Sequence, residues 1–244
     1  MTDIYRIAEI NIAVTSLHCE VHRLCADYRK PCVAPDLAVQ TMQSDIDFER
    51  EKSAREDEKE GIPARWFSDA YLETLAVYRK IAEKMPDYDI ILFHGSCVAV
   101  DGVGYLFTAK SGIGKSTHTE LWRELLGSRA VMVNDDKPLI RVTDAGATIY
   151  GTPWDGKHRL STNIAVPLKA LCILERAEKN SIRKITAMEA YPMLLQQAYR
   201  PLDSMALCKT LTLIDKLASA VNLWRLGCNR DIEAARVAYE AMKG

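Results

Sequence analysis

The sequence predicts an α/β fold in which helices flank a sheet and a phosphate-binding loop joins a strand to a helix. Short apolar segments typical of strands follow one another at 90–95, 97–102 and 104–110, with Asp-Gly as the turn between the last two. A glycine-rich loop follows, and a helix is expected over 115–126. The unbroken apolar run at 130–135 then indicates a buried strand. Strand, loop, helix and strand together form a βαβ unit.

The N-terminal region is expected to contain strands and two helices. Residues 4–14 alternate apolar and polar side chains and predict one strand, with a shorter strand at 36–41. The dense mixed charge of 45–61 is typical of a solvated helix or surface segment. Apolar residues at helical spacing predict a packed helix over 64–84, ended by Pro86.

These patterns suggest a division into two parts. Residues 1–85 are interpreted as a β-containing extension and 86–244 as the core that carries the phosphate loop. One domain over 1–244 is the alternative, because a chain of 244 residues with 48% apolar content can bury a single large core.

The second half of the chain continues the alternation of strands and helices. Further strands are expected at 138–142, 147–151, 169–175, 181–186 and 221–228. Helices are expected at 187–197 and 204–220, and a last one opens at Asp231.

Composition excludes several classes of partner. A formal net charge of −1 offers no basic surface for nucleic acid and no polybasic anchor for a membrane. Charges or prolines interrupt each apolar run before membrane-spanning length, and the first residues lack the pattern of a secretion signal. A cytoplasmic protein is therefore expected, while the oligomeric state is left open.

The seven cysteines are odd in number and follow no framework spacing, so reduced thiols are expected. His18, His22 and Cys25 would share one face if 17–28 is helical, which raises metal binding as one interpretation. Because no Cys-x-x-Cys pair is present, buried thiols with exposed imidazoles are the favoured interpretation.

The segment AKSGIGKST at 109–117 lies between an apolar strand and a helix, which is the setting of a phosphate-binding loop. Gly112 and Gly114 permit backbone angles that turn successive N–H groups inward, toward phosphate oxygens at the positive end of the helix. The Walker A pattern has glycine where Ala109 stands, and a small residue is kept there. A plain Gly-Ser turn before a helix is the alternative.

Each residue of the loop has an expected role toward ATP and Mg²⁺. Lys115 would reach the β and γ phosphates, Ser116 would offer its hydroxyl to Mg²⁺, and Thr117 would bond an inner phosphate. The predicted nucleotide-binding residues are Ser111, Gly112, Ile113, Gly114, Lys115, Ser116 and Thr117.

Two carboxylates follow at the end of the next strand, 20 residues beyond Lys115. Asp135 is assigned to the metal, together with Ser116, and Asp136 to the base that accepts a proton from an attacking hydroxyl. That second role expects the pKa of Asp136 to be raised by its neighbour. Ordinary capping aspartates at a strand end are the alternative.

At this point the residues resemble a known family. His94-Gly95, two short strands, Ser-Gly-x-Gly-Lys-Ser and a strand that ends in Asp-Asp before Lys137 resemble the HPr kinase/phosphorylase family over 90–142. That family shares its nucleotide-binding core, a mixed sheet flanked by helices, with phosphoenolpyruvate carboxykinase. The resemblance implies ATP, Mg²⁺, phosphoryl transfer to a serine-type hydroxyl, Asp136 as acid/base and His94 beside it. By itself, a histidine here is more often a hydrogen-bonded core residue, and the position of His94 ahead of the phosphate loop makes the functional interpretation equally favoured.

A second basic cluster, GTPWDGKHR at 151–159, forms a glycine- and proline-rich loop. Lys157 or Arg159 would clamp the migrating phosphoryl group, with Trp154 covering the substrate. A surface turn with solvated charges and an anchored tryptophan is the alternative. Two side chains on the helix after the phosphate loop are further candidates for the same cavity: His118 and Trp122.

Three function classes follow from these residues. The first is an ATP-dependent kinase whose acceptor is a hydroxyl of a small molecule or of a protein or peptide serine. The second is an ATP-sensing binding protein without an acceptor, and the third is a simple NTPase. The identity of the acceptor, the choice between ATP and GTP and a reverse phosphorolysis are not encoded in a readable pattern.

Overall fold

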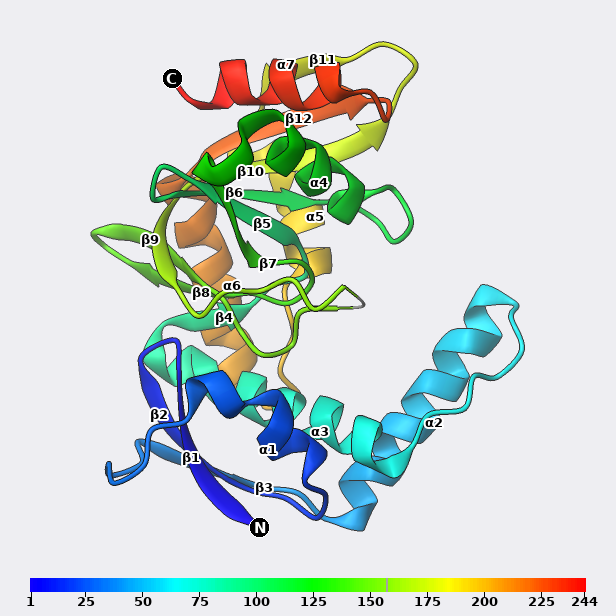
Figure 1. Cartoon of the computed structure of the whole chain (residues 1–244), viewed down its shortest axis with the longest axis vertical. Helices are drawn as coiled ribbons and strands as arrows, with labels where there is room; N and C mark the ends of the chain where they lie inside the picture. The colour runs from blue at the N-terminus through cyan, green and yellow to red at the C-terminus, as the bar shows by residue number, and fades with distance from the viewer. Residues whose placement is uncertain (157) are drawn as a thin grey trace. The chain divides into compact units, whose positions relative to one another are not determined.

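The computed structural model describes residues 1–156 and 158–244. The chain consists of two compact units, Met1–Ala82 and Glu83–Gly244. Figure 1 shows the helices and strands of both units along the chain.

The first unit holds a sheet of three strands: β1 (Thr2–Ile7), β2 (Ile10–Thr15) and β3 (Leu37–Gln40). β1 and β2 are antiparallel, whereas β3 runs parallel to β2. The single strand predicted over 4–14 is wrong, because the chain reverses at Ala8 and Glu9. Both residues have left-handed backbones, with φ of 49° and 67°. Neither is a residue type that favours this region, so the sequence carries no turn signal there.

The helices of the first unit are α1 (Glu20–Leu24), the 3₁₀ turn η1 (Ala26–Tyr28), α2 (Gln43–Glu60) and α3 (Asp69–Lys84). α2 confirms the helix predicted from mixed charge. α3 begins five residues later than predicted, because the hydroxyl of Ser68 accepts the Tyr71 N–H and starts the helix there.

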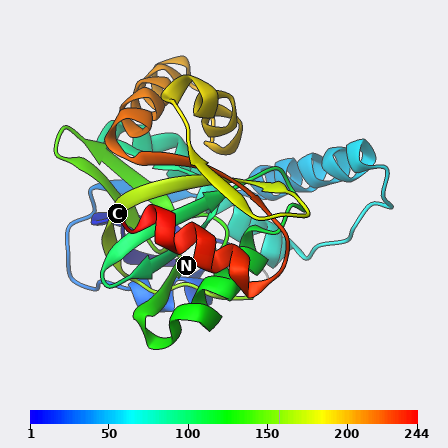
Figure 2. The ribbon, with the colours of Figure 1, turned by 90° about the horizontal axis from the view of Figure 1, so that it is seen from above.

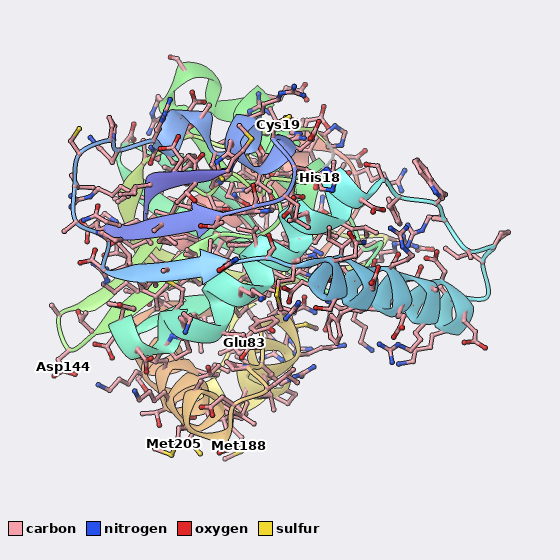
Figure 3. The ribbon with its side chains drawn as sticks, turned by 90° about the horizontal axis from the view of Figure 1, so that it is seen from below. His18, Cys19, Glu83, Asp144, Met188 and Met205 are labelled. Carbon is pink, nitrogen blue, oxygen red and sulfur yellow. The ribbon has the colours of Figure 1, made fainter. Side chains whose placement is uncertain are left out.

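A buried carboxylate on α3 ties three segments of this unit together. Glu73 accepts the backbone N–H groups of Leu17 at 2.6 Å and His18 at 2.7 Å, and also the hydroxyl of Thr41. His18 and Cys19 lie on the segment between β2 and α1 (Figure 3). These charge-assisted bonds offset the cost of burying Glu73.

The histidine and cysteine cluster of this unit is a hydrogen-bonded one. Both ring nitrogens of His22 are engaged, Nδ1 with the Tyr5 hydroxyl at 2.6 Å and Nε2 with the Ser16 hydroxyl at 2.8 Å. The imidazole of His22 was expected to be exposed, but it is half-buried by these contacts. Cys25 is buried, and burial raises the pKa of its thiol to about 12.

The second unit is built on one mixed sheet. Its main path runs in the order β4 (Ile90–Leu92), β8 (Leu139–Thr143), β9 (Gly146–Tyr150), β10 (Ala165–Arg176), β6 (Val103–Thr108), β5 (Ser96–Val100), β7 (Ala130–Asn134). β12 (Asn222–Cys228) pairs in parallel with β10, and β11 (Ser181–Lys184) pairs antiparallel with β12.

The predicted βαβ unit is present, but its two strands, β6 and β7, are separated in the sheet by β5. β6 leads through the loop and α4 (Lys115–Leu126) to β7. Both β6 and β7 pair antiparallel with β5, so they run parallel to each other on its two sides. The predicted bounds of α4 are confirmed.

Helices cover both faces of this sheet. α5 (Ala187–Gln197) and α6 (Ser204–Ala220) lie on one face, whereas α4 and α7 (Ile232–Met242) lie on the other (Figure 2). β10 serves both faces, because Leu171 and Ile173 join one core cluster while Cys172 and Leu174 join the other. This explains its unbroken apolar sequence.

Two of the predicted helix starts are confirmed by their caps. Thr186 and Glu189 form a capping box that opens α5, and the Asp203 carboxylate accepts the Ala206 N–H at 2.9 Å to open α6. Across the described part of the chain, none of the helices combines the length and apolar character needed to cross a membrane.

Replacing Glu9 with glycine is expected to raise the free energy of unfolding by about 0.5–1 kcal/mol, because glycine adopts the left-handed turn without a Cβ penalty. Urea unfolding followed by circular dichroism measures this. Glu9→Ala is the matched control, since alanine also removes the charge but keeps the Cβ. Equal stabilisation by both variants would contradict the explanation.

Candidate functional site

The loop between β6 and α4 has the backbone of an anion nest. Gly112 and Gly114 have φ of 77° and 117°, in the left-handed region that side-chain-bearing residues avoid. The Ile113 N–H bonds the Lys110 carbonyl at 3.4 Å, which closes the turn. Ala109 is fully buried in the core beneath the loop, where a small side chain fits.

The N-terminus of α4 is left free for an anion. No side chain caps the helix at Gly114, and its first turn contains no acidic residue. The first N–H groups of a helix have no partner inside the helix, and its dipole places partial positive charge there. The Lys115 ammonium lies 3.5 Å from the Ala109 carbonyl, so a cation stands beside these donors.

Asp135, at the end of β7, lies against the start of α4. Its Oδ1 accepts the hydroxyl of Ser96 at 2.7 Å, and the Ser96 hydroxyl also lies 2.8 Å from that of Thr119. Burial raises the pKa of Asp135, and hydrogen bonds from Ser96 and Ser116 partly oppose this. The predicted pair of oxygen donors, Ser116 and Asp135, is therefore brought together.

Asp136 pairs with the predicted histidine. His94 Nε2 lies 3.3 Å from Asp136 Oδ1, and the Lys137 ammonium lies 3.8 Å from Oδ2. Burial alone would raise the pKa of Asp136, but the bond from His94 and the charges of Lys137 and Lys115 outweigh it and lower the pKa. The expectation of a raised pKa is thus wrong for Asp136. The raised pKa belongs to Asp135.

Burial also lowers the pKa of Lys115, while the charges of Asp136 and Asp135 act in the opposite direction. The ammonium of the loop and the two carboxylates at the end of β7 are therefore close enough to influence one another. The nest, the lysine and the acidic pair form one site within the second unit.

Asn134 orients the acidic pair, a role that sequence reasoning missed. Its Oδ1 accepts the N–H groups of Asp136 at 2.9 Å and Lys137 at 2.7 Å. Its Nδ2 donates to the carbonyl and hydroxyl oxygens of Thr152 at 3.1 and 3.0 Å. Asparagine commonly bonds its own backbone two residues on, so an Asn before the pair was the available signal.

Gly95, next to His94, is required by close packing. Its N–H donates to the Asp136 carbonyl at 3.0 Å. A Cβ at this position would lie 2.8 Å from Leu106 Cδ1 and 2.9 Å from the Phe107 carbonyl oxygen. The close approach of the two segments brings His94 beside Asp136.

The segment 151–156 comes close to the acidic pair at Gly156. A Cβ at Gly156 would lie only 3.1 Å from Asp136 Cβ. Trp154 is buried, which fits the interpretation of an anchored side chain. Arg159 is exposed and has a left-handed backbone with φ of 52°. Lys157, the other predicted clamp, lies outside the described residues.

Asp155 adds a third carboxylate that the sequence did not single out. It is 7% exposed, and its Oδ2 accepts the Ser161 hydroxyl at 2.9 Å. Its buried Oδ1 has no hydrogen-bond partner in the described part of the chain. Burial raises the pKa of Asp155, and Asp135 contributes in the same direction. Its distance in sequence from the acidic pair hid this relationship.

His118 and Trp122 were candidates for the cavity beside the acidic pair, but the structure places them elsewhere. The Trp122 indole N–H donates to His118 Nε2 at 3.1 Å, and the Phe107 ring packs against both rings with centroids 4.7 and 5.1 Å away. Both side chains lie on the face of α4 that packs on β6. His118 lines a separate cavity, together with Ile113 and Thr117.

Comparisons with known proteins find a likeness in structure but none in sequence. No protein-family model matches the chain, and curated protein sequences yield no match. The structure of the Hpr(Ser) kinase/phosphatase from Coxiella burnetii is similar at 13% identity and a TM-score of 0.34, covering 63% of this chain and 99% of that chain. A likeness this weak carries no argument about activity or site residues.

The buried imidazole of His118 predicts a loss of stability in acid. Burial lowers its pKa from 6.5 to about 4, so between these values the unfolded chain takes up a proton that the folded chain does not. Stability is then lost as the pH falls from 6.5 toward 4, by about 3 kcal/mol. Urea unfolding of wild type and His118→Gln across this range measures the difference. An unchanged pH profile in the variant would contradict it.

Proposed function

We propose that this protein is an ATP-dependent kinase that transfers the γ-phosphoryl group to a hydroxyl of a small molecule or of a protein or peptide serine. The observation that carries the proposal is the uncapped nest at Gly112–Gly114, with Lys115 and Ser116 beside the carboxylates of Asp135 and Asp136. A nest, a cation and an acidic pair in one place are the parts that phosphoryl transfer requires.

The proposed nucleotide contacts follow the loop. Backbone N–H groups of the loop and of the first turn of α4 bind phosphate oxygens, because they lie at the positive end of α4, whose start has no side-chain cap. Lys115 turns from the Ala109 carbonyl to the β and γ phosphates. The weak 3.5 Å contact is lost at little cost.

The site's donors fit Mg²⁺. Ser116 and Asp135 supply a hydroxyl and a carboxylate, the oxygen ligands that Mg²⁺ prefers, and phosphates and water complete its shell in such sites. When bound between these residues, Mg²⁺ would neutralise charge that develops on the phosphates.

Asp136 is proposed as the group that receives the acceptor's proton. Its lowered pKa keeps it ionised at neutral pH, and the pairing with His94 holds one carboxylate oxygen in place. Kinases use an aspartate in this way because the transition state is loose and little basicity is needed. Arg159 on the neighbouring loop, with Lys157, is proposed to stabilise the migrating group.

Lys115→Ala is expected to weaken Mg-ATP binding by about 10- to 100-fold, because a charge-assisted contact to the phosphates is lost. Isothermal titration calorimetry measures the affinity. Lys216→Ala is the matched control, since this lysine lies on α6 and pairs with Asp144. Unchanged affinity in Lys115→Ala, or no Mg-dependent ATP binding by the wild type, would contradict the proposal.

Asp136→Asn is expected to keep ATP affinity within a few-fold while lowering turnover by about 10²- to 10⁴-fold, since the amide cannot accept the proton. Transfer from γ-labelled ATP to a panel of hydroxyl acceptors measures turnover. Equal turnover in the variant would remove Asp136 as the base. Phosphate release that no acceptor stimulates would favour a simple NTPase.

A further inference from the structure

A second hollow opens beside the phosphate loop, away from the acidic pair. This cavity has a volume of about 440 Å³, within the range of small-molecule sites. Thr117, His118 and Leu121 of α4 form one wall, and the segments 176–178 and 228–230 form the other. Ile113 and Gly114 of the loop also line it, so the cavity is continuous with the nest.

His118, which lines this wall, has an unused hydrogen-bond donor. An indole N–H only donates, so His118 Nε2, which receives the bond from Trp122, carries no proton. The neutral ring therefore carries its proton on Nδ1. Nδ1 is buried and has no hydrogen-bond partner among the described residues, and the side chain is 2% exposed.

An unpaired buried donor destabilises the folded protein, and a ligand that accepts its hydrogen bond would remove that cost. Among the described residues, the bond to Trp122 uses only Nε2, so Nδ1–H is left without an acceptor. A ligand in the cavity that carries a hydrogen-bond acceptor would pair with this N–H.

Three consecutive residues link the cavity to the acidic pair. Lys115 and Ser116 interact with Asp136 and Asp135, whereas Thr117 lines the cavity. A triphosphate that places its γ end at the carboxylates therefore has its inner end at Thr117. Whatever is attached to that inner end enters the cavity.

We propose that this cavity is the nucleoside subsite of the ATP site, and that His118 Nδ1–H donates a hydrogen bond to the bound nucleoside. The inference rests on the proposed function, because it assumes a triphosphate in the nest. Leu121 and the half-buried Cys228 supply the apolar contact that a base requires. Arg176, on the wall opposite α4, donates a hydrogen bond to the Gly112 carbonyl of the loop at 2.6 Å.

The subsite is tested by separating nucleoside from phosphate binding. Calorimetry with ATP and with inorganic tripolyphosphate compares wild type, His118→Phe and the more polar His118→Gln. His118→Phe is expected to weaken ATP binding about 5- to 10-fold, consistent with one lost hydrogen bond, and to leave tripolyphosphate binding within twofold. Trp122→Phe removes the bond that keeps the proton on Nδ1, so it is expected to weaken ATP binding in the same direction and also to leave tripolyphosphate binding within twofold.

A second measurement needs no variant. Alkylation of Cys228 by iodoacetamide, followed by peptide mass spectrometry, is expected to slow several-fold with ATP but not with tripolyphosphate. Cys208 is exposed on α6 and serves as the internal reference.

Each outcome decides the proposal. Equal losses of ATP and tripolyphosphate affinity in His118→Phe, or ATP affinity unchanged in both His118 variants, would overturn the role of His118. Cys228 that reacts equally with and without bound ATP would overturn the subsite. Failure of the proposed function looks different, because neither ATP nor tripolyphosphate would then bind the wild type.

Discussion

The candidate site depends on the side chain of Asn134 at the end of β7. Its amide group bonds forward to the N–H groups of Asp136 and Lys137 and across to Thr152, so it fixes both the acidic pair and the loop beside it. The residue is fully buried, and each of these bonds replaces one that water would otherwise provide. Asn134 therefore holds the backbone from which the Asp136 side chain points toward His94.

Environment separates the chemical roles of neighbouring carboxylates. Asp135 and Asp136 are adjacent in sequence and equally acidic in water, yet burial raises the pKa of one and cationic neighbours lower that of the other. The two side chains leave a strand end in different directions, one toward Ser96 and Ser116 and the other toward His94. Divergent environments of this kind are how a pair of like groups acquires different functions.

The phosphate loop lies between two dissimilar surroundings. On one side are Lys115, the acidic pair and Asp155, which suit phosphate and a divalent cation. On the other is a cavity with an apolar wall and the unpaired donor of His118. A nucleotide is charged at one end and aromatic at the other, and the proposed binding mode assigns one half of the site to each end.

The sequence by itself determined the features that arise within a few residues. The bounds of α4, α5 and α6, the left-handed glycines of the loop and the two aspartates at a strand end follow from local propensity, capping and turn chemistry. Only the tertiary structure decided the position of β5 between β6 and β7, the pairing of His94 with Asp136 and the orientation of His118. These depend on through-space contacts between distant segments, whose burial and charge set each group's chemistry and which no local pattern records.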